Sequence, residues 1–378
     1  MDCTSWTRFR SLGRSILRQP GAGPAGTRVE SELSELLNER SDFPLSLLDI
    51  EADGLHAVLG GPTLFHIDGR REPALFVSVL MHGNETTGWD AIRRVLRKYM
   101  GTDGFDLPRS LSLFVGNTAA AQAGVRHLDD QPDFNRVWPG SETSGTTAHE
   151  LMRKVMDTMA DRELFASIDV HNNTGLNPHY ACVNVLEHSS LHLAALFGRT
   201  VVYFVRPRGV ASMAMAALGP SVTLECGKVG HAHGVDHAAD YLDACLHLAE
   251  IPNHPVARHD VDLYHTVAIV RVPAGQAFGF GDDAAPVNFP RNLDVMNFRE
   301  LPVGTLFAEL GNGSTIPLDV RDEEDRLVSD RFFAVEDDRL VTRVPVMPSM
   351  LTRDPLVIRQ DCLCYLMERY DEHLADAG

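Results

Sequence analysis

Short apolar runs alternate with segments of helical periodicity over residues 63–250. The predicted strands are Thr63–Ile67, Ala74–Leu80, Leu111–Val115, Leu164–Val170, Cys182–Leu186, Val201–Val205 and Val222–Leu224. The predicted helices cover residues 87–100, a stretch from Thr147 through Met159 that opens on a capping box, and residues 236–250. This alternation is typical of an α/β layer structure with a mixed, mostly parallel central sheet flanked by helices.

The pattern changes after Pro252-Asn-His-Pro255, where helical periodicity gives way to short strand-like runs. These runs are Thr266–Val272, Thr305–Leu310, Arg331–Val335 and Leu340–Val346, separated by turns rich in Gly, Pro and Asp. We therefore predict an α/β domain over residues 29–252 and a smaller, mainly β C-terminal domain over residues 253–378.

The first 28 residues carry five arginines against one acid, Asp2, and end in a Gly- and Pro-rich stretch. They contain no apolar segment of signal-peptide length, so we predict a disordered tail. Ser31–Asn38 follows with the pattern of a short amphipathic helix.

Charge and cysteine usage narrow the class of protein. The formal net charge of −18 argues against nucleic acid or an anionic membrane surface as partner. No apolar run approaches the length of a membrane span. Six scattered cysteines are typical of reduced thiols in a cytoplasmic enzyme. Whether the chain forms a homo-oligomer stays open.

Polar residues follow directly after four of the predicted strands. They are His82 with Glu85, Asn117, His171 and Glu225. Carboxyl ends of parallel strands share one edge of a sheet, where ligands bind in open α/β folds. The alternative is that these residues have only structural roles, as a polar helix start and a hydrogen-bonded core histidine. Because four such sites lie at one edge of the sheet, we favour a functional role.

Three of these residues form a plausible metal set. A catalytic zinc usually keeps three protein ligands and an open position for water, and His82, Glu85 and His171 supply that set. Glu225 ends an apolar strand, where burial raises a carboxyl pKa toward the range that a general base requires. Asp169, two residues before His171, either orients that ligand or caps a loop.

The loop after Asn117 contains two arginines and an asparagine, namely Arg126, Asn135 and Arg136. In a chain this acidic, they are suited to recognise an anionic substrate and a developing oxyanion. We therefore expect a small substrate that bears a carboxylate.

With these motifs the chain resembles the succinylglutamate desuccinylase/aspartoacylase family of zinc-dependent acylases, which are related to metallocarboxypeptidases. The matching pieces are His82-Gly-Asn-Glu85, Arg126 with Asp133-Phe-Asn135-Arg136, Asp169-Val-His171-Asn, and Glu225-Cys-Gly-Lys228. They occur in the family's order, and the resemblance spans roughly residues 55–250.

The resemblance implies a zinc carboxypeptidase-like fold with one zinc ion per chain on His82, Glu85 and His171. It implies that Glu225 acts on the zinc-bound water as general base and then as acid. It also implies that Arg126 polarises the scissile carbonyl, and that Asn135 and Arg136 hold the substrate carboxylate. The expected reaction is hydrolysis of the amide bond of a small N-acyl amino acid.

The sequence departs from the family at two places. Gln131-Pro132 lengthens the arginine loop, and Met215 lies where an aspartoacylase has an arginine. Acetylaspartate is therefore a poor candidate substrate. Arg206 and Arg208 either supply the missing charge or are ordinary surface residues.

Other interpretations stay open at this stage. His231, His233 and His237 form a rival histidine cluster, although none follows a predicted strand. One alternative function is that of a metallocarboxypeptidase that trims peptides, which would use the same zinc ion and the same Asn-Arg pair. A catalytically silent homologue that binds zinc and ligand is the third possibility.

Overall fold

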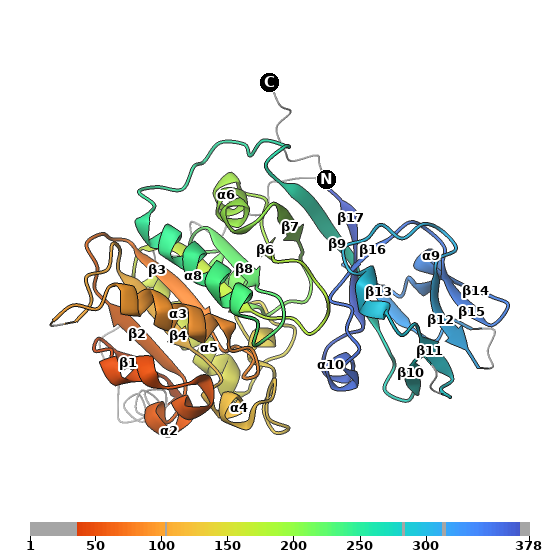
Figure 1. The fold of residues 1–378 in the computed structure, drawn as a ribbon, viewed down its shortest axis with the longest axis horizontal. Helices are drawn as coiled ribbons and strands as arrows, with labels where there is room; N and C mark the ends of the chain where they lie inside the picture. The colour runs from red at the N-terminus through yellow and green to blue at the C-terminus, as the bar shows by residue number, and fades with distance from the viewer. Residues whose placement is uncertain (1–35, 103, 282–283, 312–314, 371–378) are drawn as a thin grey trace, which may run out of the picture.

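The computed structural model describes residues 36–102, 104–281, 284–311 and 315–370 (Figure 1). The predicted tail over residues 1–28 and residues 31–35 of the predicted first helix lie outside these ranges. Asn38, predicted to end that helix, instead begins strand β1 (Asn38–Arg40), which pairs in parallel with β2 (Thr63–Ile67). No helix among the described residues is long and apolar enough to cross a bilayer.

A twelve-stranded sheet forms the centre of the molecule, in the order β1-β2-β4-β3-β5-β8-β6-β7-β9-β17-β16, with β13 paired to β9. Its other strands are β3 (Ala74–Val79), β4 (Leu111–Val115), β5 (Leu164–His171), β6 (Tyr180–Val183), β7 (Thr200–Tyr203), β8 (Ser221–Glu225), β9 (Asp262–Arg271), β13 (Asp319–Asp322), β16 (Met347–Ser349) and β17 (Cys364–Arg369). Neighbours β4, β3, β5 and β8 are all parallel, so their carboxyl ends lie at one edge.

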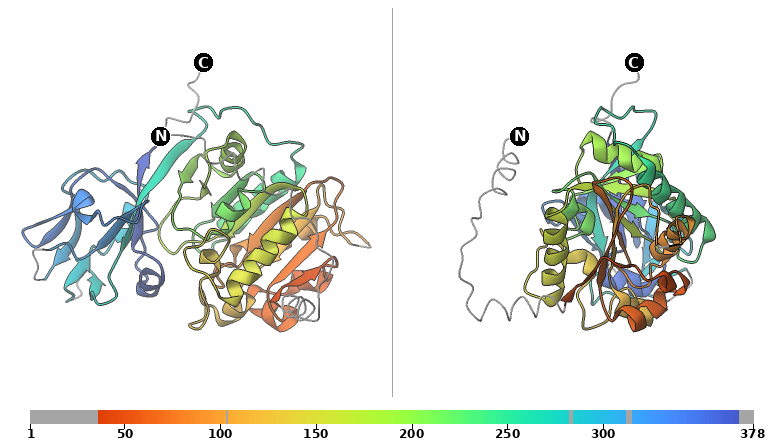
Figure 2. Two further views of the ribbon diagram at one scale, coloured as in Figure 1. Left: turned by 180° about the vertical axis from the view of Figure 1, so that it is seen from behind. Right: turned by 90° about the vertical axis from the view of Figure 1, so that its left-hand side faces the viewer.

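Helices cover both faces of this sheet, which confirms the predicted α/β class (Figures 1 and 2). They are α2 (Leu55–Leu59), α3 (Thr87–Lys98), α4 (Thr118–Ala123), α5 (Thr147–Ala160), α6 (His188–Phe197), α7 (Ala211–Met215) and α8 (Ala232–His247), with 3-10 helices η2 (Leu45–Asp49), η3 (Ala52–Gly54) and η4 (Phe134–Arg136). Strand β3 shows why both faces are covered: Leu75 and Val77 belong to the core that α3 and α8 share, whereas Phe76 belongs to the core on the α5 face.

One helix start differs from the prediction. The cap of α5 is Thr146, whose hydroxyl accepts the His149 N–H while its backbone is extended, so Thr147 is already the first helical residue. The prediction that the capping box lies at Thr147-Ala-His-Glu150 is therefore wrong by one residue.

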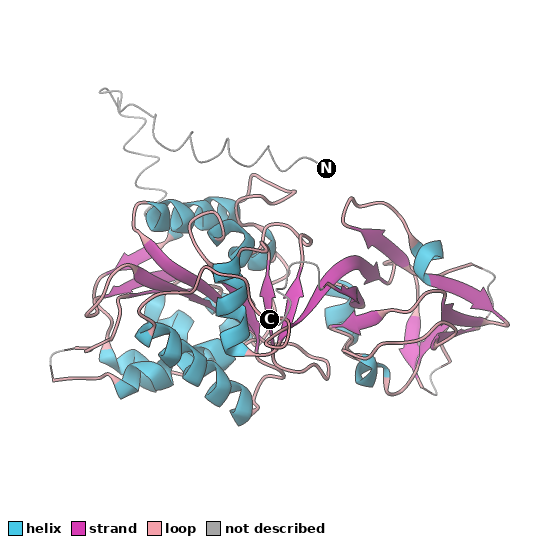
Figure 3. Cartoon of the chain, turned by 90° about the horizontal axis from the view of Figure 1, so that it is seen from above, coloured by secondary structure: helices cyan, strands magenta, loops and turns pink. Residues whose placement is uncertain are grey.

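A separate five-stranded sheet lies beyond the central one, in the order β10-β11-β12-β15-β14 (Figure 3). Its strands are β10 (Phe278–Phe280), β11 (Val287–Phe289), β12 (Leu306–Leu310), β14 (Phe333–Glu336) and β15 (Arg339–Thr342), accompanied by η5 (Leu293–Met296), α9 (Ser329–Phe332) and α10 (Pro355–Gln360). The smaller sheet domain is thus present. The boundary at residue 252 stays a prediction. Four strands that follow it in sequence belong to the central sheet and not to the smaller one, namely β9, β13, β16 and β17.

The C-terminal segment docks against the loop that follows β5. The Thr174 hydroxyl donates to Thr352 Oγ1 at 2.8 Å, and the Met350 N–H donates to Asn177 Oδ1 at 3.0 Å. Gly175 lies so close that a Cβ there would be 1.9 Å from Leu351 O. Only glycine allows this backbone approach.

Gly175→Ala is expected to lower the free energy of unfolding by about 2 kcal/mol, because the added methyl forces the two backbones apart. Urea unfolding would measure the change. Gly61→Ala is the matched control, since a Cβ there meets nothing within 4 Å. Equal stabilities of the two variants would contradict this account of the docking.

Candidate active site

The ends of β3, β5 and β8 bring the predicted site residues together. The three strands are adjacent and parallel, and His171 at the end of β5 is in register with Glu225 at the end of β8. His82 and Glu85 lie in the turn between β3 and α3, at the same edge. Thus four residues from three distant parts of the sequence meet because strand register brings them to one place.

The turn from His82 to Glu85 lies against the backbone of α4. A Cβ on Gly83 would be 2.2 Å from the carbonyl carbon of Ala120, so this position requires glycine. The Glu85 N–H donates to His82 O at 3.1 Å, which closes the turn and turns both side chains toward β5. The local sequence therefore fixes how His82 and Glu85 face His171.

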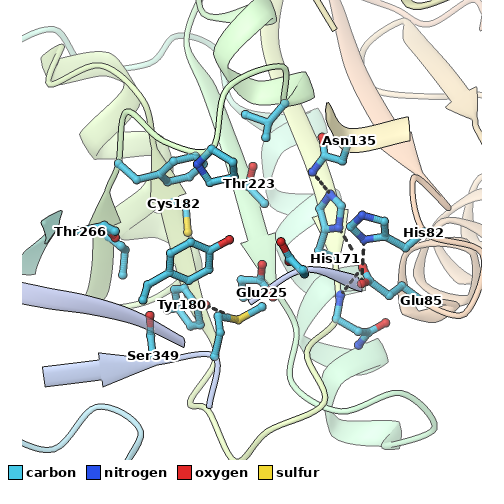
Figure 4. A pocket seen from close by; sticks show the side chains of 18 of the residues that line it. His82, Glu85, Asn135, His171, Tyr180, Cys182, Thr223, Glu225, Thr266 and Ser349 are labelled. Carbon is cyan, nitrogen blue, oxygen red and sulfur yellow. Dashed lines mark hydrogen bonds and ion pairs between the residues drawn. The ribbon is translucent and has the colours of Figure 1, made fainter. Parts of the chain in front are cut away.

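Glu85 lies between two imidazole rings (Figure 4). Its Oε1 is 2.8 Å from His82 Nδ1, and its Oε2 is 2.8 Å from His171 Nδ1. One ligand atom from each residue lies within 4.8 Å of the others, and no other group of three His, Cys, Asp or Glu residues in the described ranges meets that condition. Two imidazoles and one carboxylate are suited to bind one divalent metal ion.

Each histidine has a second carboxylate behind it. Asp133 Oδ1 is 3.1 Å from His82 Nε2, and Asp169 Oδ2 is 2.7 Å from His171 Nε2. The Ser78 hydroxyl in turn donates to Asp169 at 2.6 Å. Carboxylates in this position hold a ring Nε2–H and leave Nδ1 for the metal. This arrangement supports the orienting role predicted for Asp169 and adds one for Asp133.

The buried charges hold one another in the ionised state. Burial alone raises the pKa of Glu85, but His82 and His171 outweigh it and leave that pKa below its usual value. Burial likewise lowers the pKa of His171, and Asp169 with Glu85 raises it well above its usual value. The acids around His171 therefore favour positive charge at this ring.

Glu225 differs from these paired acids. Its Oε2 is buried and has no hydrogen-bond partner among the described residues. Burial raises its pKa to about 8, with the nearby His171 opposing and Glu85 adding to the shift. This carboxyl can therefore exchange a proton near neutral pH.

Arg126 and Arg136 are both held by acids. Arg126 donates to Asp133 Oδ2 from Nε at 3.0 Å and from Nη2 at 2.8 Å. Asp361 bridges the two arginines, at 3.3 Å from Arg126 Nη2 and 2.8 Å from Arg136 Nη2. Arg126 Nη1 also lies 4.0 Å from Glu85 Oε1, so this guanidinium borders the metal ligands.

Asn135 lies in η4, near the end of the same arginine loop, and contacts the ligand set. Its Nδ2 is 3.2 Å from His171 Nε2, and its Oδ1 accepts the Ala211 N–H at 3.0 Å. The hydrogen bond from Ala211 thus fixes the amide, with its Nδ2 facing the His171 ring.

Several site residues come from the C-terminal region and carry no motif in the sequence. The pocket that contains the metal ligands is also lined by Thr266, Ser349, Met350, Asp361 and Tyr365. They lie about 40 to 280 residues beyond the strand-end motifs. Only the long-range pairing of β9, β16 and β17 with the central sheet brings them to the site.

Some predicted residues lie elsewhere. Asn117 is not among the pocket-lining residues of the described chain; its side chain accepts the Ala120 N–H and caps α4. Met215 is fully buried in the core beneath α7. Arg206 lines the pocket but its Nη1 is 2.6 Å from Glu142, and Arg208 is exposed.

The rival histidine cluster forms, but away from the pocket. His233 and His237 lie on α8 with ring centroids 5.0 and 5.1 Å from that of His179, and His237 Nε2 is bonded to Phe197 O. His231 is exposed at the start of α8. The cluster does not bring three ligand atoms together within the described residues.

Residues 71–247 match the family model of the succinylglutamate desuccinylase/aspartoacylase catalytic domain. No curated protein matches the chain in sequence. Similar solved structures include a succinylglutamate desuccinylase from Vibrio parahaemolyticus, with 13% identity, coverage of 82% of this chain and 88% of that one, and a TM-score of 0.54. A mutant of murine aminoacylase 3 has 16% identity, 79% and 96% coverage, and a TM-score of 0.52. At these identities the likeness concerns the fold.

For the metal-free proteins, the free energy of unfolding of wild type is expected to fall relative to that of Glu225→Gln as the pH rises. The folded-state pKa of about 8 exceeds the usual 4.5, so the folded chain binds this proton more tightly than the unfolded chain does. The stabilisation is complete below about pH 4.5 and is lost as the pH rises to about 8, by at most about 5 kcal/mol.

Urea unfolding of both chelator-treated proteins between pH 5 and 9 would measure this difference. Glu336→Gln, at an exposed position in β14, controls for the loss of one charge. A difference between wild type and Glu225→Gln that stays constant over this range would contradict the prediction.

Proposed function

We propose that this chain, whose residues 71–247 match the model of the succinylglutamate desuccinylase/aspartoacylase catalytic domain, is a zinc-dependent hydrolase that cleaves the amide bond of a small N-acyl amino acid. The observation that carries the proposal is the Glu225 carboxyl beside a buried His–Glu–His set, with its buried Oε2 lacking a hydrogen-bond partner among the described residues. The other acids that line this pocket are paired, Glu85 with two histidines and Asp361 with two arginines. Glu225 is therefore the group best suited to move a proton.

The residues present fit a zinc ion. His82, Glu85 and His171 offer nitrogen and oxygen donors, and Asp133 and Asp169 orient the two rings. A zinc ion held by these residues would polarise an amide carbonyl and bring the pKa of a water molecule toward neutrality.

Glu225 takes the proton of the attacking water and returns it to the departing amine. A carboxyl with a pKa of about 8 is suited to both steps, because near neutral pH it holds a proton or releases one at little free-energy cost. Its position opposite His171 in the β5–β8 register places it next to the metal ligands. The same residue thus serves as base and then as acid.

The two arginines have different roles in this proposal. Arg126 borders Glu85 and stabilises negative charge that develops on the scissile carbonyl oxygen. Arg136 lies farther out, with a side chain 26% exposed, and binds the substrate carboxylate together with Asn135. A bound carboxylate shares Arg136 with Asp361.

The cellular setting is part of the proposal. The five described cysteines are all buried and none is paired in a disulfide. Buried thiols without disulfides suit a reducing compartment, so we propose a cytoplasmic enzyme of amino acid metabolism.

Purified protein is expected to contain one zinc ion per chain. Glu85→Gln should weaken zinc binding by at least about 100-fold, because it removes a charged ligand from between two imidazoles. Glu225→Gln should keep the zinc ion and lose at least about 1,000-fold in kcat, since only the proton-transfer group changes.

Metal analysis and turnover of the same samples separate these two effects. Folded, metal-free protein that takes up no zinc would exclude the zinc assignment. Near-normal turnover by Glu225→Gln would remove Glu225 from the mechanism.

Arg126→Gln and Arg136→Gln are expected to affect different kinetic constants. Loss of Arg126 removes an interaction that strengthens in the transition state, so kcat should fall about 100-fold with little change in KM. Loss of Arg136 removes binding that ground state and transition state share, so KM should rise about 10-fold or more.

Steady-state kinetics on a single N-acyl amino acid would test both variants. Unfolding midpoints should be compared, because each variant leaves Asp361 with one arginine fewer. The same fall in kcat for both variants would contradict the division of roles.

A further inference from the structure

The pocket extends past Glu225, away from the metal ligands, into a region that is lined by uncharged side chains. Figure 4 shows His82, Glu85 and His171 on one side of Glu225, and Tyr180, Cys182 and Thr266 on the other. We call this region the neutral compartment. It is defined by Tyr180, Cys182, Thr223, Thr266, Ser349 and Met350.

Strand register explains how the neutral compartment forms. Thr223 precedes Glu225 by two residues on β8, so both side chains lie on one face of the sheet. Cys182 of β6 is opposite Thr223, and Val202 of β7 is opposite Cys182. A row of small and apolar side chains thus crosses the sheet two residues before the Glu225 carboxyl.

The polar atoms of this region are uncharged. Burial raises the pKa of the Cys182 thiol and of the Tyr180 phenol well above their usual values, and Glu225 adds to both shifts. The Tyr180 hydroxyl lies 3.1 Å from Met350 Sδ, and Tyr180 and Cys182 pack in one apolar cluster with Val202. At neutral pH neither the thiol nor the phenol carries a charge.

Every arginine that lines the pocket is held elsewhere. Arg126 and Arg136 pair with Asp361 on the metal side. Arg206 also lines the pocket, but its Nη1 pairs with Glu142 and its Nε donates to Glu323 O, both at 2.6 Å. None of these three cations is therefore positioned to receive a carboxylate in the neutral compartment.

The neighbouring pocket has the opposite character. It shares Arg136 and Arg206 with the catalytic pocket, and five arginines outnumber three acids in its lining: Arg136, Arg206, Arg208, Arg271 and Arg321 against Glu142, Asp322 and Asp325. Arg208 and Arg271 form no ion pair with any described residue. In a chain with a net charge of −18, free arginines beside Arg136 attract an anion to that end.

We propose that the substrate has one carboxylate, which the Arg136 end binds, and one uncharged apolar group, which the neutral compartment binds. The inference rests on the proposed amide hydrolysis and adds the substrate class. A carboxylate buried without a cation is strongly disfavoured, whereas each buried methylene favours binding. A second carboxylate, such as that of a succinyl group, would therefore be rejected.

Two pairs of substrates matched in carbon skeleton test this inference with the zinc-loaded full chain. N-butanoylglycine is compared with N-succinylglycine, and N-acetylnorvaline with N-acetylglutamate, so that the acyl group and the side chain are varied separately. In at least one pair the uncharged member is expected to have a kcat/KM about 100-fold higher, and in neither pair is the charged member preferred. Preference for a charged member, or no discrimination in either pair, would overturn the inference.

A cation placed in the compartment provides a second test. Met350→Arg is expected to reduce the preference for the uncharged member at least about 10-fold, because a carboxylate then finds a partner. Met350→Leu keeps the apolar side chain at the same backbone position and is expected to keep the preference. The same preference in both variants would contradict the location of the compartment.

Binding to zinc-loaded Glu225→Gln separates this inference from the proposed function. Calorimetry with the same four compounds reports the preference without hydrolysis. If no compound is hydrolysed by wild type but the uncharged ones bind more tightly, amide hydrolysis is wrong and the compartment assignment is supported. If hydrolysis occurs and the charged compounds bind more tightly, the compartment assignment alone is wrong.

Discussion

The position of the Glu85 carboxylate between two imidazoles determines most of what surrounds it. A buried carboxylate at 2.8 Å from both His82 Nδ1 and His171 Nδ1 needs positive charge, either protons or a metal ion. The two rings then need carboxylates on their far sides, which Asp133 and Asp169 supply. The charges therefore alternate outward from one buried carboxylate.

The same alternation links the site to the C-terminal region. Asp133 holds Arg126, Arg126 contacts Asp361, and Asp361 holds Arg136. Since Asp361 precedes β17, a strand of the central sheet, the smaller domain is anchored beside this ion-pair network. A C-terminal extension with only a structural role would not need a half-buried acid that contacts two arginines of the α/β region. The C-terminal region is therefore part of the site.

The local pattern of apolar and polar residues predicted the proposed metal ligands, because these residues follow strands that are clearly apolar. The runs before His82 and His171 are buried throughout or nearly so, and parallel pairing brings their ends together. Asn117 had the same signal, yet its side chain caps α4, because a polar residue after a strand also begins helices. Strand-end position predicts proximity, and it does not separate ligands from caps.

The C-terminal contributions were beyond prediction for a different reason. Asp361 is 225 residues from Arg136 along the chain, and no periodicity relates them. Their contact depends on β17 pairing with β9, which in turn pairs with β7. The predicted all-β pattern after residue 252 was sound for the smaller sheet, but a period of two does not reveal which sheet a strand joins.

One strand, β8, carries both the proposed proton-transfer group and part of the neutral compartment. Glu225 and Thr223 are two residues apart on β8, and their neighbours on β6 are Tyr180 and Cys182. Exchanging Thr223 or Cys182 alters the compartment without changing the strand register that places Glu225 opposite His171. The metal ligands lie on other strand ends and are unaffected. The fold therefore lets substrate class change one side chain at a time while the hydrolytic groups stay fixed.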